Sequence, residues 1–252
     1  MKFTASASMV FTLTLAIVGA LTQSSLAQES QPEIDGSRIV AIDILLEPDP
    51  TMVKRAIAAN ADLRENYPQG YTLGPEQVPH VSLVQRYVKA ADLKAIETAV
   101  SDVLANEDPR ELQLMATGYA YAPWAGVSIT GIAVEPTPEL KRLQTSIVKA
   151  VEPFAVPDGT VAAFSTSKEL PKVEEAIVDY VKTFVPKASG DKYNPHVTVG
   201  VGREEFVKQL KSEPFQKFTF KPVGVAVYHL GGFGTAQKRL WQWKPAPAQP
   251  AR

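Results

Sequence analysis

The 252-residue chain contains no cysteine. Disulfide scaffolds, thiolate metal sites, cysteine nucleophiles and acylated lipoprotein anchors are therefore excluded. Histidine is scarce as well, with only three copies, at His80, His196 and His229. Because imidazole titrates near neutral pH and serves as an acid, a base or a metal ligand, the placement of these three residues is informative about function.

The chain also lacks an excess of charge of either sign. Its 26 Lys and Arg residues face 27 Asp and Glu residues, which leaves a formal net charge of −1. This balance argues against a protein that coats long nucleic acids through its net field, although local basic grooves stay open. The apolar fraction of 45% and the charged fraction of 21% are typical of a globular chain with one large or two ordinary domains.

The apolar run near the N-terminus is too short to cross a membrane. It covers residues 9–20 and has 12 residues, whereas a membrane-spanning helix needs roughly 20. Lys2 precedes this run and a small-residue site, S-L-A, ends at Ala27. The pattern predicts a secretory signal peptide over residues 1–27, the alternative being a membrane anchor. We therefore expect a secreted or periplasmic protein with no membrane attachment after cleavage.

Residues 38–243 are predicted to form a single domain between a polar linker at 28–37 and a Pro/Ala-rich tail at 244–252. Strand and helix patterns alternate there without a strict strand–helix–strand rhythm, which predicts an α+β fold. The expected strands lie at 38–46, 80–88, 112–121, 126–134, 195–201, 218–227 and 240–243. The expected helices lie after Asp49, over 93–103, after Thr137, over 173–184 and over 204–210, and the fourth of them is expected to bury Val173, Ile177, Tyr180 and Phe184.

One short segment occurs twice in the chain. V-P-H-V-S-L-V at 78–84 aligns without a gap with N-P-H-V-T-V-G at 194–200. Successive side chains of a strand point to opposite faces, so each copy presents a histidine and a hydroxyl on one face and apolar residues on the other. The proline before each histidine belongs at the start or edge of a strand. Each histidine is therefore expected near a strand end, where a cleft can open.

A single strand histidine beside a hydroxyl is most often structural. Here, however, the repeat uses two of the three histidines in the chain and keeps their surroundings in register, which favours a shared site. Two imidazoles on either side of one phosphate can act as general base and general acid. Fixed hydroxyl groups can stabilise the charge that develops on the phosphate oxygens. The pattern does not assign which histidine is the base.

The two segments resemble the paired H-φ-[ST]-φ motifs of the two-histidine phosphoesterase superfamily, which includes RNA-ligase-like cyclic phosphodiesterases. The resemblance implies a bilobal, pseudo-symmetric α+β fold with antiparallel-rich sheets, outer helices and a central cleft to which each lobe contributes one motif strand. It also implies that His80 and His196 are the catalytic pair and that Ser82 and Thr198 bind the phosphate.

The same resemblance implies hydrolysis of cyclic phosphodiesters without a metal or other cofactor. The expected substrate is a small nucleotide or a single-stranded RNA end, and we expect a monomer. Two features depart from compact members of the family: a long insert at residues 153–190, which includes an extra helix, and the predicted secretion signal.

Weaker candidates surround the two motifs. Arg86 has the same strand parity as His80 and Ser82, so it is expected to reach the phosphate or else to lie on a solvated rim. Tyr193, with Lys192 beside it, is expected to flank the cleft and contact the substrate. The aromatic residues of the 118–126 segment are expected to pack on the core, with stacking on a base as the alternative. His229 is expected to be a capping or surface residue.

The sequence motifs of several other enzyme classes are absent from the chain. The chain has no H-E-x-x-H, no G-x-S-x-G, no G-x-G-x-x-G and no Walker A sequence. Two other hypotheses remain beside the phosphoesterase. One is a non-catalytic module that binds a phosphorylated ligand or an oligonucleotide in the same cleft, and the other is a duplication whose histidines are purely structural.

Overall fold

A computed structural model describes residues 36–124 and 126–245. The predicted signal peptide at 1–27, most of the predicted linker at 28–37 and most of the predicted tail at 244–252 lie outside the described residues. Within the described ranges, no helix combines the length and apolarity needed to span a bilayer.

The described residues form an α+β fold, as the sequence predicts. The nine strands are β1 (Ile39–Pro48), β2 (Val81–Lys89), β3 (Leu114–Trp124), β4 (Val127–Val134), β5 (Ala155–Val156), β6 (His196–Gly202), β7 (Phe218–Phe220), β8 (Pro222–Leu230) and β9 (Ala236–Gln242). The α-helices are α1 (Pro50–Asn66), α2 (Leu93–Leu104), α3 (Pro138–Val151), α4 (Glu175–Ala188) and α5 (Glu204–Ser212).

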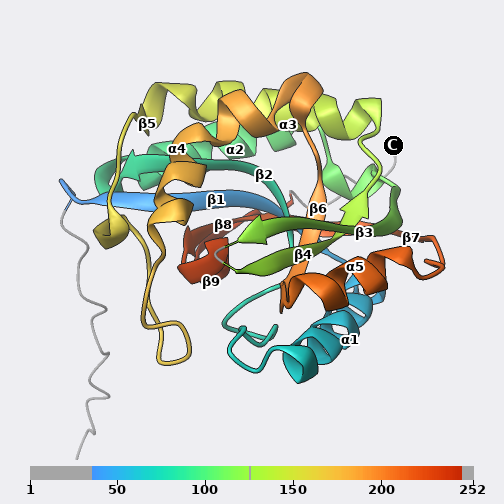
Figure 1. Ribbon diagram of the computed structural model, residues 1–252. Coiled ribbons are helices and arrows are strands. Elements are labelled where there is room, and N and C mark those ends of the chain that lie inside the picture. The colour runs from blue at the N-terminus through green and yellow to red at the C-terminus, as the bar shows by residue number, and fades with distance from the viewer. Residues whose placement is uncertain (1–35, 125, 246–252) are drawn as a thin grey trace, which may run out of the picture. The chain divides into compact units, whose positions relative to one another are not determined.

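The strands form one antiparallel sheet in the order β7-β3-β4-β6-β2-β1-β8-β9, with β5 paired to β2. The two motif strands, β6 and β2, are neighbours at the centre of this order, and three strands follow on either side. Each half thus has a motif strand as its inner member, which confirms the predicted bilobal, pseudo-symmetric arrangement. Figure 1 shows α2 beside α3, α1 near α5, and α4 across β1 and β2.

Helix α1 begins where the sequence predicts it. The Asp49 carboxylate accepts hydrogen bonds from the backbone N–H groups of Thr51 and Met52, at 2.9 and 3.2 Å, and Pro50 occupies the first turn. These contacts satisfy backbone donors that a helix N-terminus leaves unpaired. The predicted stripe is buried as expected and consists of Met52, Ala56, Ala59 and Leu63.

The side chains of strand β1 alternate between the two faces of the sheet. Its residues Val40, Ile42, Ile44 and Leu46 enter the main core, which also contains the buried side chains of α1, α2 and α3. Ala41, on the opposite face, enters a smaller core formed with residues of the 153–190 insert. Asp43 has the same parity as Ala41, which directs its carboxylate away from the main core.

The predicted burial of the fourth helix is partly wrong. Helix α4 begins at Glu175, after Val173, and its buried side chains are Ile177, Val178, Val181 and Phe184. Tyr180 is 36% exposed. The helix packs Val178 and Val181 against Tyr87 and Phe164 in the smaller core, and this contact turns Tyr180 to a different side of the helix.

The predicted strand at 218–227 is two strands in the structure. Lys221 separates β7 from β8, and its backbone N–H donates to the Asp49 carboxylate at 2.9 Å instead of to a neighbouring strand. The last strand, β9, starts at Ala236 and is longer than the predicted 240–243 segment.

Asn60 connects helix α1 to motif strand β6. Its side-chain amide donates to the carbonyl oxygens of Tyr71 and Val199 at 3.0 and 2.8 Å, and its amide oxygen accepts from the Leu73 N–H at 2.9 Å. The side chain is buried. One amide therefore pairs three backbone groups that would otherwise be left without partners away from water.

We expect Asn60→Ala to lower the free energy of unfolding by at least about 2 kcal/mol, because buried backbone groups would lose their partners. Chemical denaturation followed by circular dichroism measures this change. Asp62→Ala, on the exposed face of the same helix, should change stability by less than about 0.5 kcal/mol. Equal effects of the two substitutions would show that Asn60 does not hold α1 to β6.

Candidate active site

One pocket contains both motifs. It has a volume of about 280 Å³ and is lined by His80 and Ser82 of the first motif and by His196 and Thr198 of the second. The structure thus brings together two pairs of residues that the sequence separates by more than a hundred positions. Purely structural histidines that point apart would not line a common cavity.

Strand pairing places the two motifs. Val81 on β2 pairs with Val197 on β6 in an antiparallel register, and both side chains are fully buried. Continuing this register by one residue in each direction sets His80 opposite Thr198 and Ser82 opposite His196. Side chains directly opposite in an antiparallel pair are close neighbours on one face. The register therefore places each histidine across from the hydroxyl residue of the other motif along the two strands.

Both imidazoles are held in the same way. Nδ1 of His80 lies 2.7 Å from the carbonyl oxygen of Val78, and Nδ1 of His196 lies 2.8 Å from that of Asn194. A carbonyl oxygen only accepts, so each Nδ1 carries a proton and donates it. The contact fixes the tautomer of each ring and leaves Nε2 as the nitrogen available for chemistry.

The ring of His196 lies against strand β4 at Gly131. A Cβ atom on Gly131 would lie 3.1 Å from Cδ2 of His196 and 3.2 Å from the carbonyl oxygen of Val197. This spacing is tighter than ordinary van der Waals contact. The absence of a side chain at Gly131 therefore lets the ring pack on the β4 backbone.

A buried carboxylate that sequence reasoning missed distinguishes the two histidines. Oδ2 of Asp43, on β1, lies 3.5 Å from Nε2 of His80. The same oxygen accepts hydrogen bonds from the Ser82 hydroxyl at 2.5 Å and from the Gln85 amide at 2.9 Å. The Asp43 side chain is fully buried. The signal that could have found it is the isolated carboxylate in the apolar strand sequence R-I-V-A-I-D-I-L-L, because buried charges require partners.

The protonation of His80 follows from these contacts. Its Nδ1 faces the Val78 carbonyl and its Nε2 faces the Asp43 carboxylate, and both partners only accept. A neutral imidazole has one N–H group, so the doubly protonated imidazolium satisfies this position best. Burial favours the neutral ring, but the contact with Asp43, its charge and the Val78 carbonyl outweigh burial and raise the pKa of His80 above its usual value of 6.5.

His196 has the opposite preference. Burial is the main influence and lowers the pKa of His196, the Asn194 carbonyl offsets part of this effect, and the charge of His80 lowers the pKa further. The pKa values of the two histidines are thus pushed apart. Such a pair can hold one protonated imidazole and one neutral imidazole at the same pH, which suits a general acid and a general base.

The two hydroxyls of the motifs differ in their contacts. The Ser82 hydroxyl donates its only proton to Asp43, so a phosphate oxygen would have to compete with that carboxylate for it. Thr198 lines the pocket, and no hydrogen bond of its hydroxyl is found within the described residues. Thr198 is therefore the better placed of the two to donate to a bound phosphate.

The predicted position of Arg86 is wrong. Arg86 forms an ion pair with Glu152 and lines a different pocket. Gln85 lines the pocket that contains the histidines instead. Arg86 is therefore not among the residues that could reach a phosphate there.

An irregularity in strand β2 explains this difference. Ile44 of β1 lies opposite Val84, whereas the next residue, Leu45, lies opposite Ser82. Leu83 is thus an extra residue in β2, as in a β-bulge. An extra residue reverses the side to which all later side chains point, so counting by twos from Ser82 fails after Leu83.

Tyr193 lies in the pocket wall, as predicted, but its hydroxyl is engaged. It donates to the backbone carbonyl of Ser82 at 2.9 Å, and the side chain is buried. Tyr193 thereby links the approach to the second motif with the first motif strand. Lys192 does not line this pocket, and its ammonium group donates to the carbonyl of Pro186 at 3.0 Å.

The aromatic residues of the 118–126 segment lie in different surroundings. Trp124 lines the pocket, whereas Tyr119 packs edge-on against Phe215 and the ring of Tyr121 lies beneath the Lys211 ammonium group. The prediction of core packing therefore holds for Tyr119 and Tyr121, which pack against the main core. Trp124 packs against the smaller core and also lines the pocket, where the alternative of stacking on a base would place it.

His229 is not at the surface, which corrects that prediction. The side chain is buried and its Nε2 lies 2.8 Å from the carbonyl oxygen of Ala163. Burial, the larger influence, lowers the pKa of His229. His229 thus has a structural contact with the insert, away from the pocket of the other two histidines.

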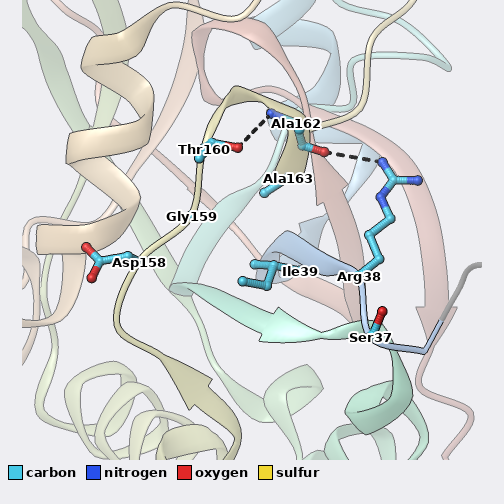
Figure 2. Close-up of a pocket in the computed structure, with 8 residues that line it drawn as sticks. All are labelled: Ser37, Arg38, Ile39, Asp158, Gly159, Thr160, Ala162 and Ala163. Atoms are coloured by element: carbon cyan, nitrogen blue, oxygen red, sulfur yellow. Dashed lines mark hydrogen bonds between the residues drawn. The ribbon is translucent and has the colours of Figure 1, made fainter.

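Figure 2 shows another pocket, between the start of β1 and residues 158–163. Arg38 and Asp158 lie on opposite sides of it, and the Arg38 guanidinium donates to the Ala162 carbonyl at 3.4 Å. None of the three histidines lines this pocket. Across the part of the chain that the structure describes, no cluster of three or more His, Asp or Glu side chains is arranged to hold a metal ion.

The chain is similar to one protein-family model and to several solved structures. The family model described as the 2′-5′ RNA ligase superfamily matches residues 50–232, which include both motifs. The crystal structure of TT0787 of Thermus thermophilus is similar with a TM-score of 0.50 at 13% identity, over 81% of this chain and 97% of that chain. At this identity the likeness shows a shared fold.

Two further solved structures are similar at lower scores. E. coli LigT complexed with 3′-AMP has a TM-score of 0.39 at 14% identity, over 82% of this chain and 98% of that chain. Kluyveromyces marxianus Usb1 with uridine monophosphate has a TM-score of 0.38 at 10% identity, over 82% and 99%. No curated protein sequence matches the chain.

We expect the two pocket histidines to titrate separately, His80 above pH 6.5 and His196 below it. Asp43→Asn should lower the pKa of His80, because burial would then act without the opposing carboxylate. NMR titration of the imidazole resonances measures both values. Glu152→Gln, a carboxylate outside this pocket, is the control and should leave both pKa values in place. Indistinguishable titrations of His80 and His196 in the wild-type protein would contradict the assignment.

Proposed function

The chain belongs to the 2′-5′ RNA ligase superfamily, and from this membership we propose that it is a phosphoesterase that hydrolyses cyclic phosphodiesters. The family match confirms the resemblance to two-histidine phosphoesterases drawn from the motifs. The proposed substrates are 2′,3′-cyclic nucleotides or RNA ends, and the proposed chemistry needs no metal ion. His80 and His196 are the proposed acid–base pair.

One observation carries the proposal. Both histidines donate from Nδ1 to a backbone carbonyl and line one pocket, yet among the described residues a carboxylate lies beside Nε2 of His80 and not of His196. The backbone contact is thus the same for the two histidines, whereas their electrostatic environments differ. Such a pair favours a reaction that takes a proton on one side of a phosphorus atom and delivers a proton on the other.

The proposed reaction is a displacement at phosphorus by water. Neutral His196 accepts a proton from the attacking water at Nε2 while the new phosphorus–oxygen bond forms. The bond from phosphorus to the ribose oxygen breaks on the opposite side, and the His80 imidazolium delivers its Nε2 proton to that oxygen. The product is a phosphomonoester, and proton exchange with water restores both rings.

The phosphate oxygens need donors as their charge grows. Thr198 is the proposed hydroxyl donor, since it lines the same pocket as both histidines and its hydroxyl has no other hydrogen-bond partner among the described residues. Donors that are already in place stabilise the transition state without reorganisation. The proposed role of Ser82 is different: by donating to Asp43 it holds the carboxylate that keeps His80 protonated.

The proposed location of the reaction is outside the cytoplasm. It rests on the predicted signal peptide at residues 1–27 alone. Sequencing the N-terminus of the protein recovered from its native compartment tests this proposal, and a mature chain that begins at Gln28 is the expected result.

We expect His80→Ala and His196→Ala each to reduce kcat on a 2′,3′-cyclic nucleotide at least about 100-fold, the usual contribution of a general acid or base. Activity should persist in EDTA. His229→Gln, which changes the third histidine, should retain most of the activity. Full activity in both alanine variants would exclude the mechanism, and ligand binding by the wild-type protein without turnover would favour a binding module.

The pH dependence of kcat/KM should be bell-shaped. Activity requires neutral His196, so it should fall as pH drops through the lowered pKa of His196. It also requires protonated His80, so it should fall as pH rises through the raised pKa of His80. Asp43→Asn should move chiefly the alkaline limb, toward lower pH, because the Asp43 charge is the smallest influence on the pKa of His196. A profile that rises steadily through the whole range would contradict the acid role of His80.

A further inference from the structure

The pocket lining contains two chemically different groups of residues. Besides the histidines and hydroxyls, it is largely apolar and aromatic. The apolar residues include Trp124, Ile129, Ile177, Tyr180, Phe184 and Phe233. Three of them belong to α4, so the insert supplies half of these six residues. We refer to these six residues as the apolar wall.

The apolar wall is held in place by specific contacts. The rings of Tyr180 and Phe184 meet edge to face, with centroids 5.7 Å apart. Phe233 has a φ of 55°, a left-handed conformation that non-glycine residues rarely adopt. Its backbone N–H donates to the Glu174 carboxylate at 3.0 Å. Strained backbone of this kind persists where the surrounding structure enforces it and is concentrated at functional sites.

The pocket is poor in positive charge. No lysine or arginine lines it within the described residues. Arg86 and Lys182, which line a separate pocket, are paired with Glu152 and Asp158. The phenol of Tyr180 is neutral at physiological pH, because burial, aided by the charge of Asp43, raises its pKa to about 12. Among the residues that line the pocket, the positive charge available to a ligand is therefore that of His80, which already faces Asp43.

We propose that this pocket selects a small phosphodiester with one negative charge and one flat, apolar-faced ring, and discriminates against the end of an RNA chain. The inference rests on the proposed function and names its substrate class. The ring would pack on the apolar wall while the phosphate lies between the histidines. A volume of about 280 Å³ is at the low end for small-molecule sites. Each further nucleotide would add a phosphate charge that no lysine or arginine of the pocket neutralises.

Three substrates test the proposal: adenosine 2′,3′-cyclic phosphate, ribose 2′,3′-cyclic phosphate without a base, and a hexaribonucleotide that ends in a 2′,3′-cyclic phosphate. We expect kcat/KM to be highest for the adenosine compound and at least about fivefold lower without the base. Raising the salt concentration from about 50 to about 200 mM should change kcat/KM for the adenosine compound by less than about threefold, the effect of a single phosphate contact.

Two variants test whether the apolar wall causes the preference for the adenosine compound. Trp124→Ala should raise KM for the adenosine compound at least about fivefold and leave kcat nearly unchanged, with little effect on the compound without a base. Tyr121→Ala is the matched control, because Tyr121 lies on the same strand and packs under Lys211 outside the pocket. It should leave both parameters near the wild-type values.

The outcomes separate the inference from the proposed function. A higher kcat/KM for the hexaribonucleotide with a steep salt dependence would overturn the inference and leave the proposed function intact. Equal kcat/KM values with and without the base would also overturn it. If none of the three compounds is hydrolysed, the proposed function fails. Dissociation constants of the same three compounds, measured by calorimetry, then test the selectivity alone, and tighter binding of the adenosine compound would support it.

Discussion

The backbone pair between Val81 and Val197 is the contact on which the site depends. It joins two strands that belong to different halves of the sheet, and a Pro-His pair stands at the start of each, just before β2 and across the first residue of β6. Because both valine side chains are buried, the alternation of the strands directs both histidines to the opposite face. The site is thus a consequence of one local register. A shift of a single residue in either strand would send one imidazole into the core.

The near-symmetry of the motifs is broken by a residue outside them. Asp43 lies on β1, which flanks only the first motif strand, and pairs in register with Gln85, three residues after Ser82. At the equivalent position on the other side, three residues after Thr198, the β4 partner is the apolar residue Ile129. Two motifs with the same backbone contacts therefore place their histidines in different electrostatic surroundings, and the proposed assignment of one histidine as acid and the other as base rests on this difference.

Much of this arrangement could be predicted from the sequence. The motif repeat, the strand parity and the capping residues Asp49 and Thr137 correctly indicated the α+β class and the meeting of the two histidines. The errors have physical causes. The extra residue at Leu83 reverses strand parity, so Arg86 turns away and Gln85 takes its place. The partner of Asp43 depends on which strands are neighbours, and the orientation of Tyr180 depends on how α4 packs. Neither can be read from a local pattern.

The side chains of helix α4 both pack in the hydrophobic cores and line the pocket. Three of its four buried residues pack in the smaller core, separate from the main core that holds most of the sheet. Ile177 and Phe184 also line the pocket, so each of them contributes both to a core and to the pocket lining. The Tyr87 hydroxyl of motif strand β2 donates to the Val178 carbonyl of α4 at 2.9 Å. A change at Ile177 or Phe184 therefore alters the packing of the sheet and the shape of the pocket together, whereas the partly exposed Tyr180 can vary with less disturbance of either core.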